Sequence, residues 1–415
     1  MGKHDEDMDD VARVNAAGRR RIEEGHPWIY REQIVHGPKA DGLSGGPLWV
    51  TVQDDRGKSL GRALWAAKSP IGLRMLGAMG DGDAHDLKRL VLARISASIG
   101  RRASVAKRST AYRLVHAEGD NLPGLFVDRY DDVIVIQTVS VAMEALKAEI
   151  VQHLVASLSP RLVVERNDSS MREFEGLPRQ ARLCWPPGDT AHSTRVQFRL
   201  GKVRFEADVR TDGKTGTFLD QSANHALVAE LVPEGGRVLD AFTHQGGFAL
   251  ALAGKARAVL ATDLEAVAVQ RTRANAALNG FTNVEVRQTD AFALLRELES
   301  RGETFDAVIL DPPALAKRGR GGGQDRNAVV RTAERGYGEL LLRGIRITAP
   351  GGILVVCSCS GPVTRALWDE LVSNAAARAG RVIQVLAREG AATDHPERLG
   401  VAETGHLKCW ILRVL

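Results

Sequence analysis

A cysteine near the end of an apolar run is the residue best suited to nucleophilic chemistry in this chain. The run GGILVVCSCSG covers residues 351–361 and carries Cys357 and Cys359. Residues two apart in an extended strand share a face, and Cys359 lies nearer the strand end. A thiol deep in an apolar strand is usually inert packing, whereas a thiol at a functional edge can be a nucleophile. The pattern therefore favours packing for Cys357 and catalysis for Cys359.

Aspartates end four predicted strands that precede this cysteine in the sequence. Asp240, Asp263, Asp290 and Asp311 close the segments RVLD, AVLATD, VEVRQTD and FDAVILD. Amphipathic segments lie between these strands, and ligands of such sheets bind at the carboxyl ends of the strands. One aspartate at such a position is often only a helix N-cap. Four of them, one for each strand, favour a shared ligand pocket.

A glycine turn follows the first of these strands. Gly246 and Gly247 would let the backbone approach a ligand at a helix N-terminus. The turn lacks the G-x-G-x-x-G pattern, so it does not indicate a pyrophosphate and fits an adenosine ligand without phosphates. Asp263 follows Asp240 by about 20 residues, the spacing at which an acidic residue binds ribose hydroxyls. Asp290 could accept from an adenine amino group, and the whole pattern is typical of class I methyltransferases, which bind S-adenosylmethionine.

A thiolate beside such a pocket suits methylation of cytosine at carbon 5. That carbon is not nucleophilic by itself, so a thiolate first adds at carbon 6 and forms an enamine-like adduct. The adduct accepts the methyl group, a base removes the proton on carbon 5, and the thiolate leaves. Asp311, directly before Pro312 and Pro313, is expected to hydrogen-bond the pyrimidine edge. The sequence does not identify the base.

Longer motifs add a resemblance that covers nearly the whole chain. They are GHPWIY (25–30), LPGLFVDRY (122–130), KTGTFLDQ (214–221), DPP (311–313), SCSG (358–361) and DHP (394–396). With them the chain resembles the cytosine-carbon-5 methyltransferases of bacterial large-subunit ribosomal RNA. That family combines an N-terminal PUA domain, a central EEHEE-type domain and a Rossmann-like methyltransferase domain.

The resemblance implies Cys359 as the nucleophile, Asp311 as a second catalytic residue and S-adenosylmethionine as the cofactor. The residues expected beside the cofactor are Phe218, Asp220, Gln221, Asp240, Phe242, Gly246, Gly247, Asp263, Asp290, Asp311 and Pro312. Many RNA cytosine methyltransferases have a second cysteine after the proline of the fourth strand, and Ala314 stands there in this chain. The glycine turn reads THQGGF, a small departure from the pattern of relatives.

Three stretches of different texture must position these residues. Residues 1–80 read as short β segments and are expected to form a PUA-like domain, with an alternating run at 47–67 that turns at 55–57. Residues 81–197 order as strand, strand, helix, strand and predict a central α+β domain. Residues 198–415 alternate strands and helices and predict a parallel, doubly wound sheet. The expected fold class is α/β, with a class I Rossmann-like domain at the C-terminus.

Basic clusters favour RNA as the partner. The net charge of +5 is mild, but Arg19, Arg20 and Arg21 form one cluster, and Lys317, Arg318 and Arg320 another. Phosphates dominate the affinity of proteins for RNA. We expect both clusters to contact ribosomal RNA, the second as a loop that closes over its backbone. Trp28 is a further candidate, although a core position is favoured for it.

Several other classes of protein are disfavoured. No apolar run approaches the roughly 20 residues that span a bilayer, and the acidic N-terminus MGKHDEDMDD has no apolar region of a secretory signal. A cytoplasmic protein without a membrane contact is expected. The four cysteines include only one C-x-C pair, so neither a disulfide framework nor a metal site is indicated. Monomer and homodimer both remain open.

Two alternative functions fit parts of the pattern. An exocyclic-amine methyltransferase would also use Asp-Pro-Pro, but such enzymes usually have an aromatic residue where Ala314 stands, and Cys359 would then have no purpose. A non-catalytic RNA-binding assembly factor could retain a vestigial pocket, but the intact strand-end carboxylates disfavour it. Loss of activity on replacing Cys359 separates the first alternative, and cofactor binding separates the second.

Overall fold

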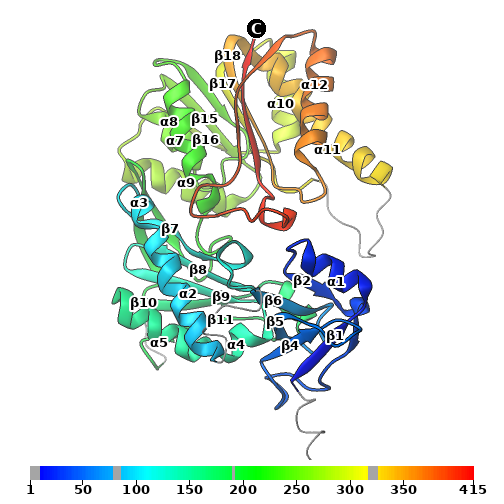
Figure 1. Cartoon of the computed structure of the whole chain (residues 1–415). Helices are drawn as coiled ribbons and strands as arrows, with labels where there is room; N and C mark the ends of the chain where they lie inside the picture. The colour runs from blue at the N-terminus through cyan, green and yellow to red at the C-terminus, as the bar shows by residue number, and fades with distance from the viewer. Residues whose placement is uncertain (1–9, 78–85, 189–191, 316–325) are drawn as a thin grey trace, which may run out of the picture. The chain divides into compact units, whose positions relative to one another are not determined.

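The computed structural model describes residues 10–77, 86–188, 192–315 and 326–415 (Figure 1). The chain divides into two compact units. Unit 1 comprises Met1–Val196, Asp208–Gly216 and Asp394–Thr404, and unit 2 comprises Gln197–Ala207, Thr217–Thr393 and Gly405–Leu415. Two short segments from later in the chain therefore fold with the N-terminal half.

The first sheet of unit 1 has six strands in the order β2-β6-β5-β4-β1-β3. The strands are β1 (Val11–Val14), β2 (Trp28–Tyr30), β3 (Ile34–His36), β4 (Trp49–Gln53), β5 (Ser59–Trp65) and β6 (Ile71–Gly77), with helix α1 (Ala16–Glu23) and the 3₁₀ turn η2 (Arg31–Gln33). Val50 and Val52 alternate into the core along β4. The turn to β5 is held by the Asp54 carboxylate, which accepts from the amides of Arg56 and Lys58. The alternating run and its turn are as the sequence predicts.

The second sheet of unit 1 has five strands in the order β11-β10-β9-β8-β7. The strands are β7 (Ala111–His116), β8 (Leu125–Tyr130), β9 (Val133–Thr138), β10 (Leu162–Asn167) and β11 (Gln180–Trp185). The other elements are α2 (Leu87–Arg101), α3 (Ala103–Ala106), η3 (Ala117–Asp120), α4 (Val141–Ala145), α5 (Lys147–Leu158), α6 (Met171–Phe174) and η5 (Ala402–Thr404). Only β9 and β10 are parallel, and α4 and α5 form the crossover between them. Helices α2, α4 and α5 share one apolar core with this sheet.

The second sheet contains two strands that the sequence analysis did not separate or find. The predicted order for residues 81–197 has two strands before the helix, but the second of them folds back as β8 and β9. Asp131 adopts the left-handed conformation at this turn, with φ of 52°, which aspartate tolerates better than most residues. Strand β11 lies at the sheet edge without a buried apolar run, so its sequence carries little strand signal.

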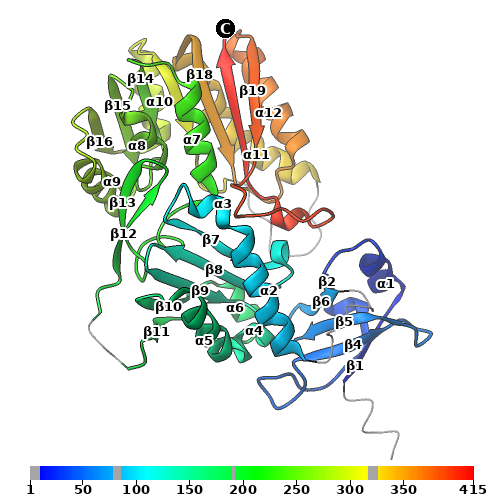
Figure 2. The same cartoon turned by 60° about the vertical axis from the view of Figure 1, so that its left-hand side comes forward.

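Unit 2 is built on a seven-stranded sheet in the order β16-β15-β14-β17-β18-β20-β19 (Figure 2). The strands are β14 (Arg237–Asp240), β15 (Ala258–Asp263), β16 (Val284–Gln288), β17 (Phe305–Leu310), β18 (Thr348–Ser358), β19 (Ile383–Glu389) and β20 (Lys408–Val414). The helices are α7 (Ser222–Leu231), α8 (Gly247–Ala253), α9 (Ala266–Leu278), α10 (Ala291–Ser300), α11 (Arg326–Ile347) and α12 (Arg365–Ala379), after the 3₁₀ turn η4 (Leu219–Gln221). A hairpin of β12 (Arg195–Leu200) and β13 (Val203–Asp208) precedes them.

Helices cover both faces of this sheet (Figure 2). Alternate residues of the central strands enter two separate cores. Leu354 and Val356 of β18 pack with α10, α11 and α12, whereas Val355 and Cys357 pack with α7, α8 and α9. The chain passes from β14 outward to β15 and β16 and then returns to β17, beside β14. Ligands of such sheets bind at this switch point, at the carboxyl ends of the strands.

The far edge of the sheet differs from the parallel arrangement that the sequence predicts. Strand β20 lies between β18 and β19 and is antiparallel to both. Strand β19 was not predicted, because it is an edge strand with no fully buried position. The last apolar run of the chain, within HLKCWILRVL, forms β20. Pairing order depends on contacts between distant segments, which the local pattern does not encode.

Candidate active site

The cysteine motif lies at the carboxyl end of β18 in unit 2. Ser358 and Ser360 both hydrogen-bond the Tyr337 phenol of α11, at 3.0 and 2.7 Å from their Oγ atoms. Because successive residues of an extended chain point in opposite directions, Cys359 lies on the other side, the side of Cys357. Cys359 is half-buried and Cys357 is fully buried. The motif therefore has one partly exposed thiol, that of Cys359, between two serines whose side chains contact Tyr337.

Cys357 is unsuited to nucleophilic chemistry. Burial, reinforced by the neighbouring Cys409 thiol, raises the pKa of Cys357 well above its ordinary value. The thiol therefore stays protonated and packs in the core with α7 and α8. The structure supports the packing interpretation of this residue.

A hydrogen-bonded chain orients the Asp311 carboxylate beyond the end of β17. The Asn224 amide donates to Gln221 Oε1 at 2.6 Å, which leaves Gln221 Nε2 to donate to Asp311 Oδ2 at 2.9 Å. Asn224 also donates to the Gly390 carbonyl, so its own position is fixed. Pro312 follows and is buried. Gln221 and Asp311, two of the predicted residues, are thus brought into direct contact.

The glycine turn between β14 and α8 fits tightly against α7. Gly246 has φ of 92°, in the left-handed region that glycine adopts without strain. A Cβ on Gly247 would lie 2.6 Å from Cε1 of His225, a residue of α7. Burial lowers the pKa of His225 to about 4, so the ring is neutral at physiological pH. Both glycines are therefore required by the local packing, and neither places a side chain at the turn.

Asp240 supplies a buried carboxylate at the same turn. The side chain is 1% exposed, and its Oδ2 accepts from Thr243 Oγ1 at 2.9 Å and from the Ala249 amide at 3.0 Å. Oδ1 is buried and has no hydrogen-bond partner in the described structure. Burial raises the pKa of Asp240 to about 7. Since buried polar atoms are normally satisfied, Oδ1 is a place where a ligand donor is expected.

Asp263 joins the glycine turn to the end of β15. Its carboxylate accepts from the His244 amide at 2.9 Å and from the Glu265 amide at 3.0 Å. The His244 ring in turn meets the Phe218 ring edge to face, with centroids 4.7 Å apart. The structure therefore gathers Phe218, Asp263 and the turn of Asp240 in one place.

The remaining predicted cofactor residues, Asp220, Phe242 and Asp290, have three different environments. The Asp220 carboxylate lies 3.6 Å from His406 Nε2, and the Asp220 carbonyl accepts from the Ala392 amide. Phe242 is half-buried against the core of α10 to α12. Asp290 is exposed and caps α10 by accepting from the Ala293 amide at 2.8 Å. For Asp290 the structure gives the helix-capping role that each of these aspartates could have.

Three residues that the sequence analysis did not single out support the site. Asn224 and His225 come from α7, and Tyr337 comes from α11. Asn224 fixes Gln221, His225 shapes the glycine turn and Tyr337 holds the serines beside Cys359. Each is a polar residue buried on a helix, which is the only signal that a single sequence offers for them.

The predicted RNA contacts on α1 divide into two kinds. Arg20 is exposed, and Arg19 lies 3.8 Å from Glu23. The guanidinium of Arg21 instead donates to the Trp28 carbonyl at 2.7 Å, so Arg21 holds the His-Pro-Trp segment in place. Lys317, Arg318 and Arg320 lie outside the described residues.

Three family-like motifs meet in unit 1 rather than at the strand ends. Thr215 of KTG donates to Asp128 Oδ2 at 2.7 Å, and its hydroxyl lies 3.0 Å from the Tyr130 hydroxyl. Arg113 binds Asp128 with two nitrogens, at 2.8 and 2.9 Å, and its amide donates to Asp394 of DHP at 2.8 Å. The sequence analysis did not foresee this buried network, since its members are far apart in the chain.

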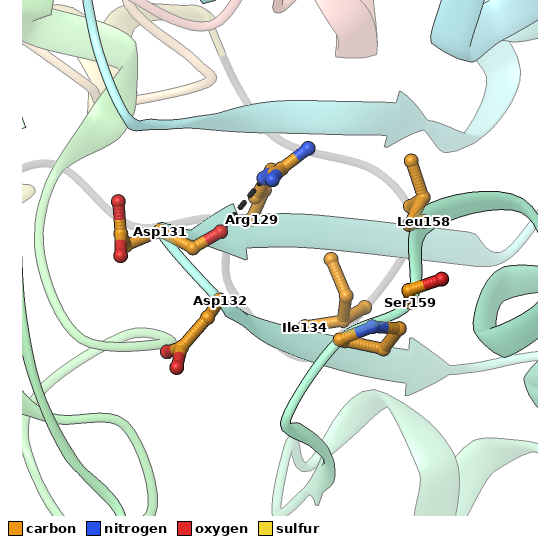
Figure 3. Close-up of a pocket in the computed structure, with 7 residues that line it drawn as sticks. Arg129, Asp131, Asp132, Ile134, Leu158 and Ser159 are labelled. Carbon is orange, nitrogen blue, oxygen red and sulfur yellow. Dashed lines mark hydrogen bonds between the residues drawn. The ribbon is translucent and has the colours of Figure 1, made fainter.

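Two pockets lie away from these residues. One, of about 130 Å³, lies at the β8–β9 turn in unit 1, where Arg129 donates to the Asp131 carbonyl (Figure 3). The other, of about 330 Å³, is lined by Arg237, Ala258 and Val284 at the amino ends of β14, β15 and β16. That edge is opposite to the one where doubly wound sheets bind ligands. Neither pocket includes a predicted site residue.

A metal-binding cluster and a membrane-spanning helix are both absent from the part of the chain that the structure describes. No group of three or more histidine, cysteine, aspartate or glutamate side chains is arranged to hold a metal ion there. Within the same ranges, no helix combines the length and the apolar character that crossing a bilayer requires.

Two family models match this chain. A model described as a methyltransferase domain matches residues 233–396, and one described as a PUA-like domain matches residues 12–77. The first match contains the glycine turn, Asp311 and Cys359, and the second covers the first sheet of unit 1 from Ala12 onward.

Solved structures share the fold over almost the whole chain. The crystal structure of SMU.776, a protein assigned as a methyltransferase and complexed with SAH, superposes with a TM-score of 0.79 at 17% identity, over 97% of this chain and 100% of that one. A structure from Streptococcus mutans, assigned as a SAM-dependent methyltransferase, gives a TM-score of 0.78 at 17% identity and the same coverage. The family models and this likeness confirm the expected fold class, a Rossmann-like methyltransferase domain preceded by a PUA-like domain.

Curated relatives extend over the full length as well. Ribosomal RNA large subunit methyltransferase I of Aeromonas hydrophila is 35% identical over 393 residues, 94% of this chain and 95% of the relative. The proteins of the same name from Tolumonas auensis and Shewanella amazonensis are 34% and 33% identical, over 94% and 96% of this chain and 96% and 98% of their own length. The resemblance read from the motifs is thereby confirmed, and the chain belongs to the ribosomal RNA large subunit methyltransferase I family.

Proposed function

We propose that this protein is an S-adenosylmethionine-dependent methyltransferase that forms 5-methylcytosine in large-subunit ribosomal RNA through a covalent adduct at Cys359. The observation that carries the proposal is the half-buried Cys359 just after β18, the strand that pairs with β17, beyond whose end Gln221 orients Asp311. The relatives that share the family act on large-subunit ribosomal RNA by name.

The residues at the glycine turn fit the cofactor. Asp240 Oδ1 is buried without a donor, and Gly247 leaves the turn free of a side chain. An aspartate at the end of the second strand, here Asp263, is the group that binds ribose hydroxyls in such folds. We therefore assign S-adenosylmethionine to Asp240, Asp263 and the two glycines, with Phe218 against one side. When bound, this cofactor supplies an electrophilic methyl group.

The chemistry assigned to the protein residues follows from cytosine itself. Cys359 adds as a thiolate to carbon 6, and Asp311, held by Gln221, hydrogen-bonds the pyrimidine edge and favours the adduct. Carbon 5 is then nucleophilic enough to be methylated, and loss of its proton lets the thiolate leave. The target base must leave its stack to reach Cys359, at a cost of roughly a few kcal/mol.

RNA binding is assigned mainly to the N-terminal part. The exposed Arg20 and the half-buried Arg19 of α1 are the described basic candidates, and Lys317, Arg318 and Arg320 are proposed to contact the RNA backbone. We further propose three domains at 1–80, 81–197 and 198–415, a cytoplasmic location, and a monomer or homodimer without a membrane contact.

Trapping the adduct tests the proposal. A large-subunit ribosomal RNA transcript that contains 5-fluorocytosine cannot lose the group on carbon 5, so a covalent protein–RNA complex should persist on a denaturing gel. Cys359→Ala abolishes the complex. Cys184→Ala is the matched control, because Cys184 lies on β11 of unit 1, where burial, with the Glu165 carboxylate beside it, raises its pKa to about 12.

Each contrary result points to a different function. If Cys359→Ala keeps full methylation, the enzyme methylates an exocyclic amine and the adduct proposal is wrong. If the wild-type protein binds no S-adenosylmethionine by calorimetry, the protein acts as a non-catalytic RNA-binding factor.

A further inference from the structure

Lys408 is a buried lysine beside the cysteine motif. It is the first residue of β20 and is only 2% exposed. Lysine is almost never buried to this degree unless its ammonium is well bonded. The ammonium donates to the Ser360 carbonyl at 2.9 Å and to the His406 carbonyl at 2.8 Å. The first of these carbonyls belongs to the residue directly after Cys359.

The strand register explains how the side chain reaches this point. Strand β20 is antiparallel to β18, with Lys408 opposite Ser358 and Cys409 opposite Cys357. Strand pairing thus fixes the chain immediately before Cys359, and the Lys408 ammonium fixes it immediately after. The Tyr337 phenol adds contacts from α11 to the serines on both sides. Cys359 therefore lies in a short segment whose backbone is held at both ends.

The charges around this segment make a cation useful. Burial raises the pKa of Tyr337, so the phenol is neutral at physiological pH. Cys357 is a neutral thiol, and the Asp311 carboxylate beyond β17 would disfavour a second anion nearby. His406, which precedes β20, lies beside the Asp220 carboxylate. The Lys408 ammonium, bonded to the carbonyl of the residue after Cys359, brings a positive charge to this motif, and a cation near a cysteine favours its thiolate.

We propose that Lys408 is a positioning residue for Cys359, whose ammonium holds the Ser360 carbonyl and so the turn of the cysteine motif, and whose charge favours the thiolate over the thiol. This inference rests on the proposed role of Cys359 as the nucleophile. It gives β20, which does not end in one of the predicted site residues, a part in preparing that nucleophile.

Alkylation of Cys359 by iodoacetamide tests the proposal without RNA or cofactor. The rate is measured against pH by mass spectrometry of the peptide that carries Cys359, in the full-length wild type, Lys408→Gln and Lys408→Arg. Glutamine keeps a hydrogen-bond donor without the charge, and arginine keeps the charge. We expect the pH midpoint in Lys408→Gln to rise by about one unit, as for one charge near a partly buried group. Lys408→Arg should stay near the wild-type midpoint.

The outcomes are separated from a general loss of structure. Cys184 serves as the internal reference, since its slow alkylation, which follows from a pKa raised to about 12, should be the same in all three proteins. In the 5-fluorocytosine assay, adduct formation by Lys408→Gln at pH 7 should be about tenfold slower than in the wild type and should recover at pH 9. If Lys408→Gln does not fold, Lys408→Met provides the uncharged side chain.

An unchanged Cys359 midpoint in the uncharged variant overturns the proposal, and so does an equal shift in Lys408→Arg. The two proposals fail in different ways. Methylation that survives Cys359→Ala refutes the adduct mechanism, whereas the alkylation profile reports on Lys408 whether or not the protein methylates RNA.

Discussion

Gly247→Ala is expected to damage the cofactor turn by a steric clash whose size the structure defines. The added Cβ would lie 2.6 and 2.7 Å from Cε1 and Nε2 of His225. Ordinary carbon contacts are about 3.5–4 Å, so the ring would have to retreat by about 1 Å. It cannot retreat freely, because it is buried and meets the Phe248 ring at a centroid distance of 4.4 Å. Overpacking of this kind costs about 1–3 kcal/mol.

The loss should appear both in the free energy of unfolding and in cofactor affinity. Urea unfolding measures the first, and calorimetric titration with S-adenosylmethionine measures the second, for which a decrease of at least about tenfold is expected. Gly254→Ala is the matched control, since Gly254 ends the same helix α8, has an ordinary φ of −67°, and has nothing within 4 Å of an added Cβ. That variant should change the unfolding free energy by less than about 1 kcal/mol.

A double-mutant cycle identifies His225 as the obstacle. His225→Ala removes the ring and leaves a cavity, at a cost of its own. In the double variant the new methyl group has space, so the two effects should sum to less than their separate costs by about 1 kcal/mol or more. Additive effects, or a Gly247→Ala protein as stable and as tightly binding as Gly254→Ala, would show that the steric account of this turn is wrong.

Four other substitutions have defined outcomes. The pKa of Asp240 is about 7 in the folded protein and its ordinary value is 3.8, so the folded state binds this proton more tightly than the unfolded state does. The free energy of unfolding of the wild type, relative to that of Asp240→Asn, should therefore fall by up to about 4 kcal/mol as the pH rises from about 4 to 7. Urea unfolding at a series of pH values measures this change. Tyr337→Phe removes the hydroxyl that bonds two serines and should lower thermal stability by about 1–3 kcal/mol and slow adduct formation. Arg20→Ala should weaken RNA binding and reduce its salt slope by about one without a change in stability, whereas Arg21→Ala, which loses the bond to the Trp28 carbonyl, should lower the melting temperature.

Local sequence pattern predicts much of the catalytic sheet. The strands that end at Asp240 and Asp263, and the one just before Asp311, carry apolar runs, whereas the one before Asp290 alternates apolar and polar residues; all four form as expected. The direction of a strand and its neighbours are not local properties. The local pattern at β20 therefore indicates a strand but not its neighbours. Its antiparallel position between β18 and β19 follows from pairings that distant residues make.

The site shows the same division between local and distant information. Strand-end position brings Asp240 and Asp263 to the glycine turn, but Asp290 at an equivalent position caps a helix and is exposed. Periodicity cannot distinguish these outcomes, since both need an aspartate before a helix. Contacts such as Gln221 to Asp311, which are 90 positions apart, depend on how α7 packs against the sheet.

Two chain segments pass from one unit into the other, and each of them is hydrogen-bonded in both units. Thr215 is held by Asp128 in unit 1, and the chain continues from it directly to Phe218 and Gln221 in unit 2. Asp394 is held by the Arg113 amide in unit 1, and the residues just before it include Ala392, whose amide donates to the Asp220 carbonyl at 2.8 Å in unit 2. Arg113 also binds Asp128. The same two segments are therefore joined to each other once within unit 1 and once within unit 2. Both connections join segments that are far apart in the sequence, and no local pattern around KTG or DHP could predict them.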